Sequence, residues 1–218
     1  MRQPFSFALA LALSLAASAH EDPKVIPAQK VIPAKAGIQD KAPASLAISA
    51  RPHLNVIAPA PEFALRDPAG ALVRLSDLRG KIVVVAFIYT TCTTTCPILS
   101  QQMATVQKRV MQDKRLRDRV MLLSVTVDPS RDSAAALASY GSRFGADPAL
   151  WKFLRESPEA MTPVLGAYRE WTRPMKDGDL DHPARVYLID ADGRIREIYS
   201  LAFFDPRQAL IDIRSLAK

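Results

Sequence analysis

The sequence predicts an α/β fold around a mixed β-sheet, and three observations indicate it. Two apolar runs, at residues 81–89 and 120–127, have the length and composition of strands that are buried on both faces of a sheet. Each run is followed by a segment whose apolar residues recur at helical spacing. A strand–turn–strand pattern and a last helical segment complete the chain, and this alternation is typical of α/β domains.

The first predicted elements form a hairpin ahead of the sheet. Residues 62–67 and 71–75 are predicted as two short strands, because Pro68-Ala-Gly70 between them is a turn sequence. The buried strand at 81–89 (KIVVVAFIY) follows. A helix is then predicted from Pro97 to about Lys114, since proline is favoured at the first helical position.

The remaining elements are predicted in the same way. The buried strand at 120–127 is followed by a helix at 133–144 and a helical region at 157–169. Residues 184–189 and 195–200 are predicted as a hairpin, because Asp192-Gly193 is a strong turn signal. Residues 206–216 are predicted as the closing helix.

Residues 1–19 have the features of a secretory signal peptide. A positive start is followed by an apolar stretch and by the small-x-small motif Ala17-Ser18-Ala19. The apolar stretch is shorter than the roughly 20 residues of a membrane-spanning helix. Cleavage after Ala19 is therefore favoured over an uncleaved anchor. Either outcome predicts export, to the periplasm or to the outer face of the inner membrane.

Residues 20–56 are predicted to be a proline-rich flexible linker, and the folded domain is predicted to span 57–218. The hexapeptide at 24–29 (KVIPAQ) is repeated almost unchanged at 30–35 (KVIPAK), and two such copies are too short to stack as a solenoid. Prolines stiffen the segment, so it would act as a spacer. His53 lies at its end and is expected to be solvated. His20 would become the N-terminal residue after cleavage, and no functional role is expected for it.

The composition limits the classes of partner. The chain has 218 residues, is 49% hydrophobic and carries a formal net charge of +7. Its basic residues are interspersed with acidic ones, and no basic patch contains the interleaved aromatic residues that grip nucleic acid. We expect no nucleic-acid partner, and we expect the protein to lie close to a membrane at most.

The chemistry of the sequence centres on Cys92 and Cys96, its two cysteines. They lie where the first buried strand gives way to the first helix. With Pro97 as the first helical residue, Cys96 is predicted to be the N-cap residue. The unpaired amides and dipole of a helix start favour an anion, so a thiolate is predicted at Cys96.

Three interpretations of the cysteine pair remain open. A structural disulfide would close a loop of only five residues, which stabilises a fold by about 2 kcal/mol. A redox dithiol is the second interpretation, although the spacing departs from Cys-x-x-Cys. The third is a metal site. Two thiolates favour Cu(I), and an imidazole completes a trigonal set suited to both copper oxidation states. A closed zinc site normally has four protein ligands, so the composition favours copper.

These motifs together resemble the Sco/SenC family of copper chaperones over residues 57–216. The motifs that occur in family order are Cys-x-x-x-Cys-Pro at 92–97, Val-Asp-Pro-Ser-Arg-Asp at 127–132, and Asp181-His182 ahead of Tyr-Leu-Ile-Asp at 187–190. The resemblance implies a thioredoxin-like fold with a mixed central sheet. The extra N-terminal hairpin is typical of its peroxiredoxin-like branch. In this fold the connection that holds His182 packs against the start of the cysteine-bearing helix.

The resemblance implies copper bound by Cys92, Cys96 and His182. The copper would be delivered to a copper-receiving protein such as a cytochrome oxidase subunit, or used to mature its copper site. Asp128 matches the family's acidic residue beside the copper loop, with two interpretations of equal weight: orientation of the site, or a turn at Asp-Pro. Pro183 follows the histidine, and we interpret it as a candidate for the cis-proline of thioredoxin folds.

The resemblance leaves an alternative function open. The cysteine pair could serve a thiol–disulfide oxidoreductase that acts on partner cysteines, with a thiol-reducing partner of its own. His182 would then be dispensable. A peroxidase is disfavoured, because the peroxidatic loop needs a proline shortly before its cysteine, and no proline occurs between Lys81 and Cys92. Thr93 and Thr94 occupy positions where the family commonly has proline and an acidic residue, which leaves the identity of the client open.

Overall fold

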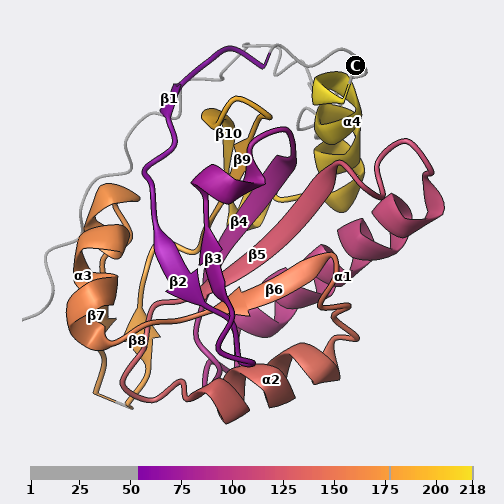
Figure 1. Cartoon of the computed structure of the whole chain (residues 1–218). Coiled ribbons are helices and arrows are strands. Elements are labelled where there is room, and N and C mark those ends of the chain that lie inside the picture. The colour runs from indigo at the N-terminus through magenta and orange to yellow at the C-terminus, as the bar shows by residue number, and fades with distance from the viewer. Residues whose placement is uncertain (1–53, 177, 218) are drawn as a thin grey trace, which may run out of the picture. The chain divides into compact units, whose positions relative to one another are not determined.

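The structure, a computed structural model, describes residues 54–176 and 178–217. A six-stranded sheet has the order β1-β10-β9-β4-β5-β6 (Figure 1). Its strands are β1 (Ala58–Pro59), β4 (Ile82–Ile88), β5 (Val120–Thr126), β6 (Trp151–Leu154), β9 (Arg185–Ile189) and β10 (Arg194–Ser200). The β4–β5 and β5–β6 pairs are parallel and the others antiparallel. The predicted α/β class with a mixed sheet is confirmed.

The two central strands, β4 and β5, are buried along their whole length, which explains their uninterrupted apolar sequences. All seven residues of β4 and all seven of β5 are buried, because helices or other elements cover both faces of the sheet. The strands pair in register from Ile82 opposite Val120 to Ile88 opposite Thr126. Their carboxyl ends therefore reach the same edge, where the segments after Ile88 and after Thr126 meet.

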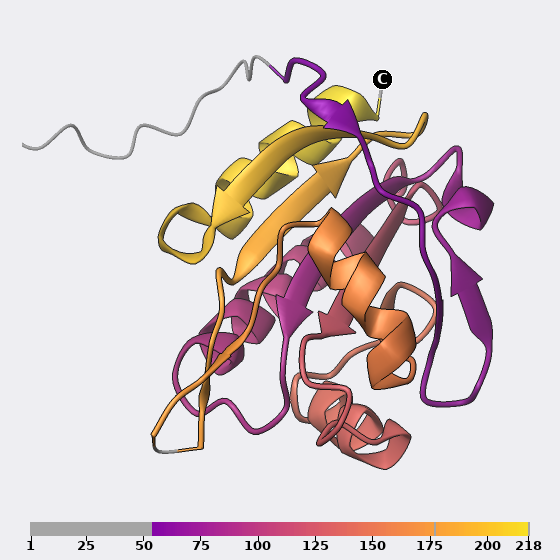
Figure 2. The ribbon, with the colours of Figure 1, turned by 90° about the vertical axis from the view of Figure 1, so that its left-hand side faces the viewer.

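Four α-helices are found in the described part of the chain: α1 (Thr95–Gln112), α2 (Ala134–Arg143), α3 (Pro158–Ala167) and α4 (Pro206–Leu216). α1 and α4 pack together on one face of the sheet, whereas α3 covers the other face (Figures 1 and 2). Ser133 and Ser157 cap α2 and α3 by accepting a hydrogen bond from an amide in the first turn. These helices confirm the four predicted helical segments.

Both predicted hairpins are present. β2 (Ala64–Arg66) and β3 (Leu72–Arg74) pair antiparallel as a separate two-stranded sheet, on the α3 side of the molecule (Figure 2). β9 and β10 are joined by the predicted turn, in which Gly193 has a φ of 77°. Glycine adopts this left-handed conformation without the steric cost that other residues incur.

The sequence did not predict four short strands, of which β1 has two residues. β6 is only four residues long, and β7 (Arg173–Pro174) and β8 (Leu180–Asp181) have two residues each. Such segments are too short for a periodic pattern, and their extended shape comes from pairing with neighbours. β7 and β8 form a small antiparallel hairpin that ends directly before His182.

The predicted signal peptide, His20, His53 and most of the predicted linker lie outside the described residues. Residues 54–56 of that linker are described: Leu54 is buried, and its carbonyl accepts a hydrogen bond of 2.8 Å from Arg196 Nε. No helix in the described part of the chain combines the length and apolar character needed to cross a membrane.

Candidate metal centre

Cys92 and Cys96 lie between the end of β4 and the first turn of α1. The helix begins at Thr95 with Thr94 as its N-cap residue, so the prediction that Cys96 is the N-cap residue was wrong. Proline lacks only an N–H that the first turn leaves unpaired, so Pro97 fits the third helical position as well as the first. Cys96 therefore belongs to the first turn, and its own amide points toward Cys92.

The helix start stabilises the sulfur of Cys92. The Cys96 N–H donates to Cys92 Sγ at 3.4 Å, and Thr95 Oγ1 lies 3.5 Å from the same sulfur. A hydrogen bond from the Cys96 thiol, with those from Thr95 and the Cys96 amide, holds the pKa of Cys92 well below its ordinary value. The sequence assigned the thiolate to Cys96, and this assignment was wrong.

Cys96 has the opposite character. Its hydrogen bond to Cys92 and its burial raise the pKa of the Cys96 thiol. Both cysteines are free and buried, Cys92 with 4% of its surface exposed and Cys96 with 1%. The pair is thus polarised into a thiolate at Cys92 and a protonated thiol at Cys96, and the thiolate is the nucleophile and metal ligand.

We expect limited alkylation of the reduced, metal-free chain with iodoacetamide to modify Cys92 before Cys96. Because the pKa of Cys92 is lowered, its rate should stay nearly flat between about pH 8 and pH 6, whereas an ordinary thiol slows roughly tenfold per pH unit. Peptide mass mapping reads the order. The rapid alkylation should be lost in Cys92→Ser and retained in Cys96→Ser. Faster alkylation of Cys96 than of Cys92 would contradict the assignment of the thiolate to Cys92.

His182 approaches the cysteines from the β8 side. Its Nε2 lies 3.9 Å from Cys96 Sγ, and its side chain is 2% exposed. The ring packs edge-on against Tyr89, with ring centroids 5.6 Å apart. The structure thus brings His182 to the start of the cysteine-bearing helix, as the resemblance implied. No described peptide bond is cis, so the interpretation of Pro183 as a cis-proline was wrong.

The backbone after His182 orients the imidazole. Ala184 has a φ of 49°, a left-handed conformation that costs a non-glycine residue about 1–2 kcal/mol. In this conformation the Ala184 N–H reaches back and donates to His182 Nδ1 at 3.3 Å. Steric strain next to a candidate ligand is common at functional sites, where the surrounding structure holds it in place.

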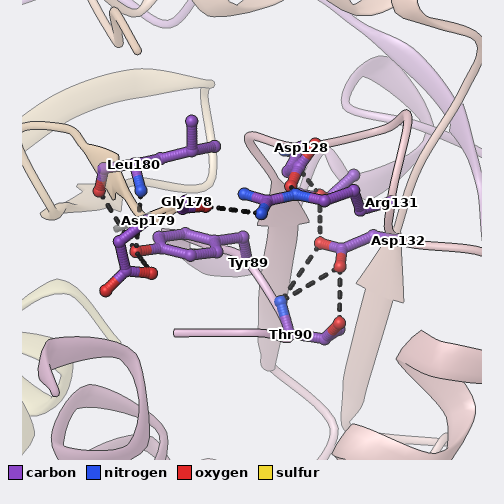
Figure 3. A network of polar contacts seen from close by, with 9 residues as sticks. Tyr89, Thr90, Asp128, Arg131, Asp132, Gly178, Asp179 and Leu180 are labelled. Atoms are coloured by element: carbon purple, nitrogen blue, oxygen red, sulfur yellow. Dashed lines mark hydrogen bonds and ion pairs between the residues drawn. The ribbon is translucent and has the colours of Figure 1, made fainter. Parts of the chain in front are cut away.

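Tyr89 fixes the segment that presents His182. Its hydroxyl lies 2.8 Å from Asp179 Oδ1 and 3.1 Å from the Leu180 carbonyl, and it accepts a hydrogen bond from the Leu180 amide (Figure 3). Burial and the hydrogen bond to Asp179 raise the pKa of Tyr89, so the phenol stays protonated. Sequence reasoning missed this role, although a polar aromatic residue ending an apolar strand is a detectable signal.

Asp128 acts on the same segment through an arginine. Its carboxylate forms an ion pair with Arg131, whose guanidinium donates to the Gly178 carbonyl at 2.7 Å (Figure 3). The guanidinium also lies 6.0 Å from the centre of the Tyr89 ring, within the range of a cation–π contact. These contacts connect the Asp-Pro turn with the loop that leads to His182. Asp128 therefore lies in the turn and also contacts, through Arg131, the segment that presents the candidate ligand.

Asp132 anchors the start of the cysteine loop. Its carboxylate accepts hydrogen bonds from the Thr90 amide at 3.1 Å and from the Thr90 hydroxyl at 2.5 Å (Figure 3). It also accepts one from the Thr126 hydroxyl at 2.5 Å. Its side chain is fully buried, and this burial raises its pKa. The sequence motif contained Asp132 but gave it no role, because its partner Thr90 is distant along the chain.

The donor set can be tested against a soft metal ion. A thiolate bound at about 2.3 Å and an imidazole at about 2.0 Å are roughly 3.7 Å apart at a trigonal angle, and Cys96 Sγ and His182 Nε2 are 3.9 Å apart. No three His, Cys, Asp or Glu side chains in the described ranges are already gathered for a metal. The three candidate ligands would therefore have to move closer together to bind one ion.

A family model described as SCO1/SenC matches residues 55–218. The chain belongs to this family. A mitochondrial SCO2 homologue of Bos taurus is 33% identical over 146 residues, which cover 65% of this chain and 53% of that protein. The chain therefore spans about half the length of this SCO1/SenC relative. An SCO1 homologue of Bacillus subtilis (strain 168) is 26% identical over 157 residues, covering 70% of this chain and 80% of its own length.

Solved structures of SCO1/SenC proteins have the same fold. Bradyrhizobium japonicum ScoI, solved with copper bound, is 32% identical with a TM-score of 0.63, covering 73% of this chain and 99% of that one. A SCO1/SenC family lipoprotein of Bacillus anthracis str. Ames is 27% identical with a TM-score of 0.66, covering 74% and 96%. These similarities confirm the predicted thioredoxin-like fold.

Proposed function

We propose that this protein is a copper-binding chaperone that holds copper through Cys92, Cys96 and His182. The observation that carries the proposal is the 3.9 Å approach of His182 Nε2 to Cys96 Sγ in a buried site. Two sulfurs and one imidazole form a soft donor set that suits Cu(I) and also accommodates Cu(II). The copper-bound relative from Bradyrhizobium japonicum supports the choice of metal.

The recipient is proposed from the family resemblance. Copper would pass to a copper-receiving protein such as a respiratory oxidase subunit, whose copper site the chaperone would mature. The predicted signal peptide and linker support a location in the periplasm or at the outer face of the inner membrane, near such a membrane-bound client. In this role the protein is a carrier, and the copper ion is its cargo.

The local contacts suit a carrier. The ion pair of Asp128 with Arg131 and the contacts of Tyr89 hold the loop that presents His182, so one ligand stays in place. The Cys92 sulfur is held by side-chain and amide contacts at the start of α1, and these contacts can be exchanged for a metal bond. A site whose sulfur can exchange such contacts for a metal bond can capture copper and release it.

A titration of the whole reduced chain with Cu(I) against a competing chelator tests the proposal. We expect tight 1:1 binding, and a His182→Ala variant should bind at least tenfold more weakly, which corresponds to about 1.4 kcal/mol. His53→Ala is the matched control, because this histidine lies in the predicted linker, and its binding should equal that of the wild type. Weak binding, or binding that does not depend on His182, would overturn the copper assignment.

The alternative is a thiol–disulfide oxidoreductase, and the polarised cysteine pair favours it. The Cys92 thiolate would attack a partner disulfide, releasing one partner thiolate, and Cys96 would then release the second by closing a Cys92–Cys96 disulfide. Two electrons would pass to the partner, and a thiol-reducing partner would restore the pair. This activity would survive His182→Ala, so insulin reduction by the same variant separates the two functions.

A further inference from the structure

Glu170 is a buried carboxylate that lies behind the candidate ligand His182. It follows α3 in a Schellman motif: Arg169 has a φ of 56°, and the Glu170 amide donates to the Leu165 carbonyl at 2.8 Å. At this position an apolar residue commonly packs against the helix it follows. Here the position holds a glutamate whose side chain is 0% exposed, a costly choice that calls for a specific partner.

The two carboxylate oxygens of Glu170 have different surroundings. Oε1 lies 3.3 Å from the Tyr187 hydroxyl and 3.5 Å from the Arg185 guanidinium. Oε2 is buried and has no hydrogen-bond partner among the described residues. It lies 4.0 Å from His182 Nδ1, slightly beyond hydrogen-bond distance. A buried acceptor left without a donor costs about 1–3 kcal/mol. The fold nevertheless retains Glu170 Oε2 in this position, facing the imidazole.

The imidazole contacts define which tautomer is present without metal. Because the Ala184 N–H donates to Nδ1, Nδ1 is an acceptor and the ring proton is on Nε2, which faces Cys96 Sγ. A metal binds the lone pair of a nitrogen, so metal binding at Nε2 requires the other tautomer, with its proton on Nδ1. The Ala184 amide cannot accept a hydrogen bond from that proton.

We propose that Glu170 Oε2 accepts the hydrogen bond of the Nδ1 proton and thereby holds His182 with Nε2 directed at copper. Nε2 releases one proton to water and Nδ1 takes one up, so the imidazole remains neutral. A small turn of the ring brings the 4.0 Å separation to hydrogen-bond length. Carboxylates that accept from a ligating histidine fix its tautomer and increase its basicity as a ligand. Glu170 is thus a positioning residue, and this role rests on the proposed copper function.

The test combines Cu(I) affinity with two-bond ¹H–¹⁵N correlation spectra of His182, which report the tautomer directly; Cu(I) is diamagnetic. In the wild type we expect an Nε2–H tautomer without metal and an Nδ1–H tautomer with Cu(I). Glu170→Leu should weaken Cu(I) binding about 10- to 100-fold and reduce the Nδ1–H population. Glu170→Gln keeps an acceptor oxygen, so its Cu(I) affinity should lie between those of the wild type and Glu170→Leu. The glutamine variant also provides the test if Glu170→Leu does not fold.

Tyr187→Phe is the matched control, because it removes a contact of Glu170 Oε1 without altering Oε2. Its Cu(I) affinity and His182 spectrum should match the wild type. Unchanged affinity in Glu170→Gln and Glu170→Leu, or an equal loss in Tyr187→Phe, would overturn the role of Glu170 while leaving the copper site intact. If His182→Ala bound Cu(I) as tightly as the wild type, the proposed function would be overturned, and the positioning role of Glu170 with it.

Discussion

Replacement of Asp132 by alanine is expected to lower the free energy of unfolding by about 3 kcal/mol. The carboxylate accepts three hydrogen bonds, from the Thr90 amide and from the hydroxyls of Thr90 and Thr126. Alanine leaves these donors in the protein interior without an acceptor. Urea unfolding followed by circular dichroism measures the loss. Asp118→Ala, at an exposed position, should change stability by less than about 0.5 kcal/mol.

The loss in Asp132→Ala should extend to the candidate metal centre. Thr90 lies two residues before Cys92, and its amide and hydroxyl both depend on Asp132. Without this anchor the cysteine loop opens more often, and Cu(I) binding weakens even under conditions where the chain remains folded. Wild-type stability together with wild-type copper affinity in this variant would show that the network does not hold the loop.

Asp132→Asn separates the charge from the hydrogen bonds. Burial raises the pKa of Asp132 above its ordinary value of 3.8, so the folded state binds this proton more tightly than the unfolded chain does. The contribution of Asp132 to stability is therefore greatest below the ordinary pKa and decreases as the pH rises through the raised pKa. Asparagine does not titrate. The stability of Asp132→Asn relative to the wild type should thus increase from about pH 4 to pH 7.

Replacement of Trp151 by alanine should have the largest effect on stability, a loss of about 4 kcal/mol. Trp151 begins β6, is 1% exposed, and its ring centroid lies 5.1 Å from that of Phe153. Its indole Nε1–H donates to Ser124 Oγ on β5 at 3.0 Å. Truncation therefore creates a cavity and also leaves a buried hydroxyl without its donor.

Trp151→Phe is the matched variant, because it keeps an aromatic ring and removes the hydrogen bond to Ser124. Its loss should be about 1–2 kcal/mol, measured by the shift of the urea midpoint at an unchanged slope. Neither substitution touches the cysteine loop, so copper affinity in the folded fraction should remain that of the wild type. A loss below 2 kcal/mol in Trp151→Ala would contradict the packing described for β6.

The main elements could be read from the sequence because their signals are local. β4 and β5 are uninterrupted apolar runs, and the turn at Asp192-Gly193 depends on adjacent residues only. β6 escaped prediction because four residues cannot show a period, and its position beside β5 comes from pairing and from the contact of Trp151 with Ser124. Local sequence predicted the main elements, whereas the order of the strands in the sheet is given by the structure alone.

The candidate ligands were likewise named from sequence motifs, and their identity as ligands stays a prediction. The sequence placed the thiolate at Cys96, whereas the structure places it at Cys92. The difference has a physical cause: the helix begins two residues before Pro97, and the Cys96 amide then points at the sulfur of Cys92. A shift this small lies within the usual uncertainty of helix ends, yet it exchanges the roles of the two cysteines.

By itself the sequence determined the fold class, the two buried strands and the motifs that show where the chemistry lies. Only the tertiary structure decided what surrounds His182. Tyr89 contacts Asp179 and Leu180, Asp132 holds Thr90, and Glu170 faces the imidazole. Each contact joins residues far apart along the chain or on separate elements. Burial, hydrogen-bond geometry and pKa depend on distances in space, and a linear pattern contains these only after the chain has folded.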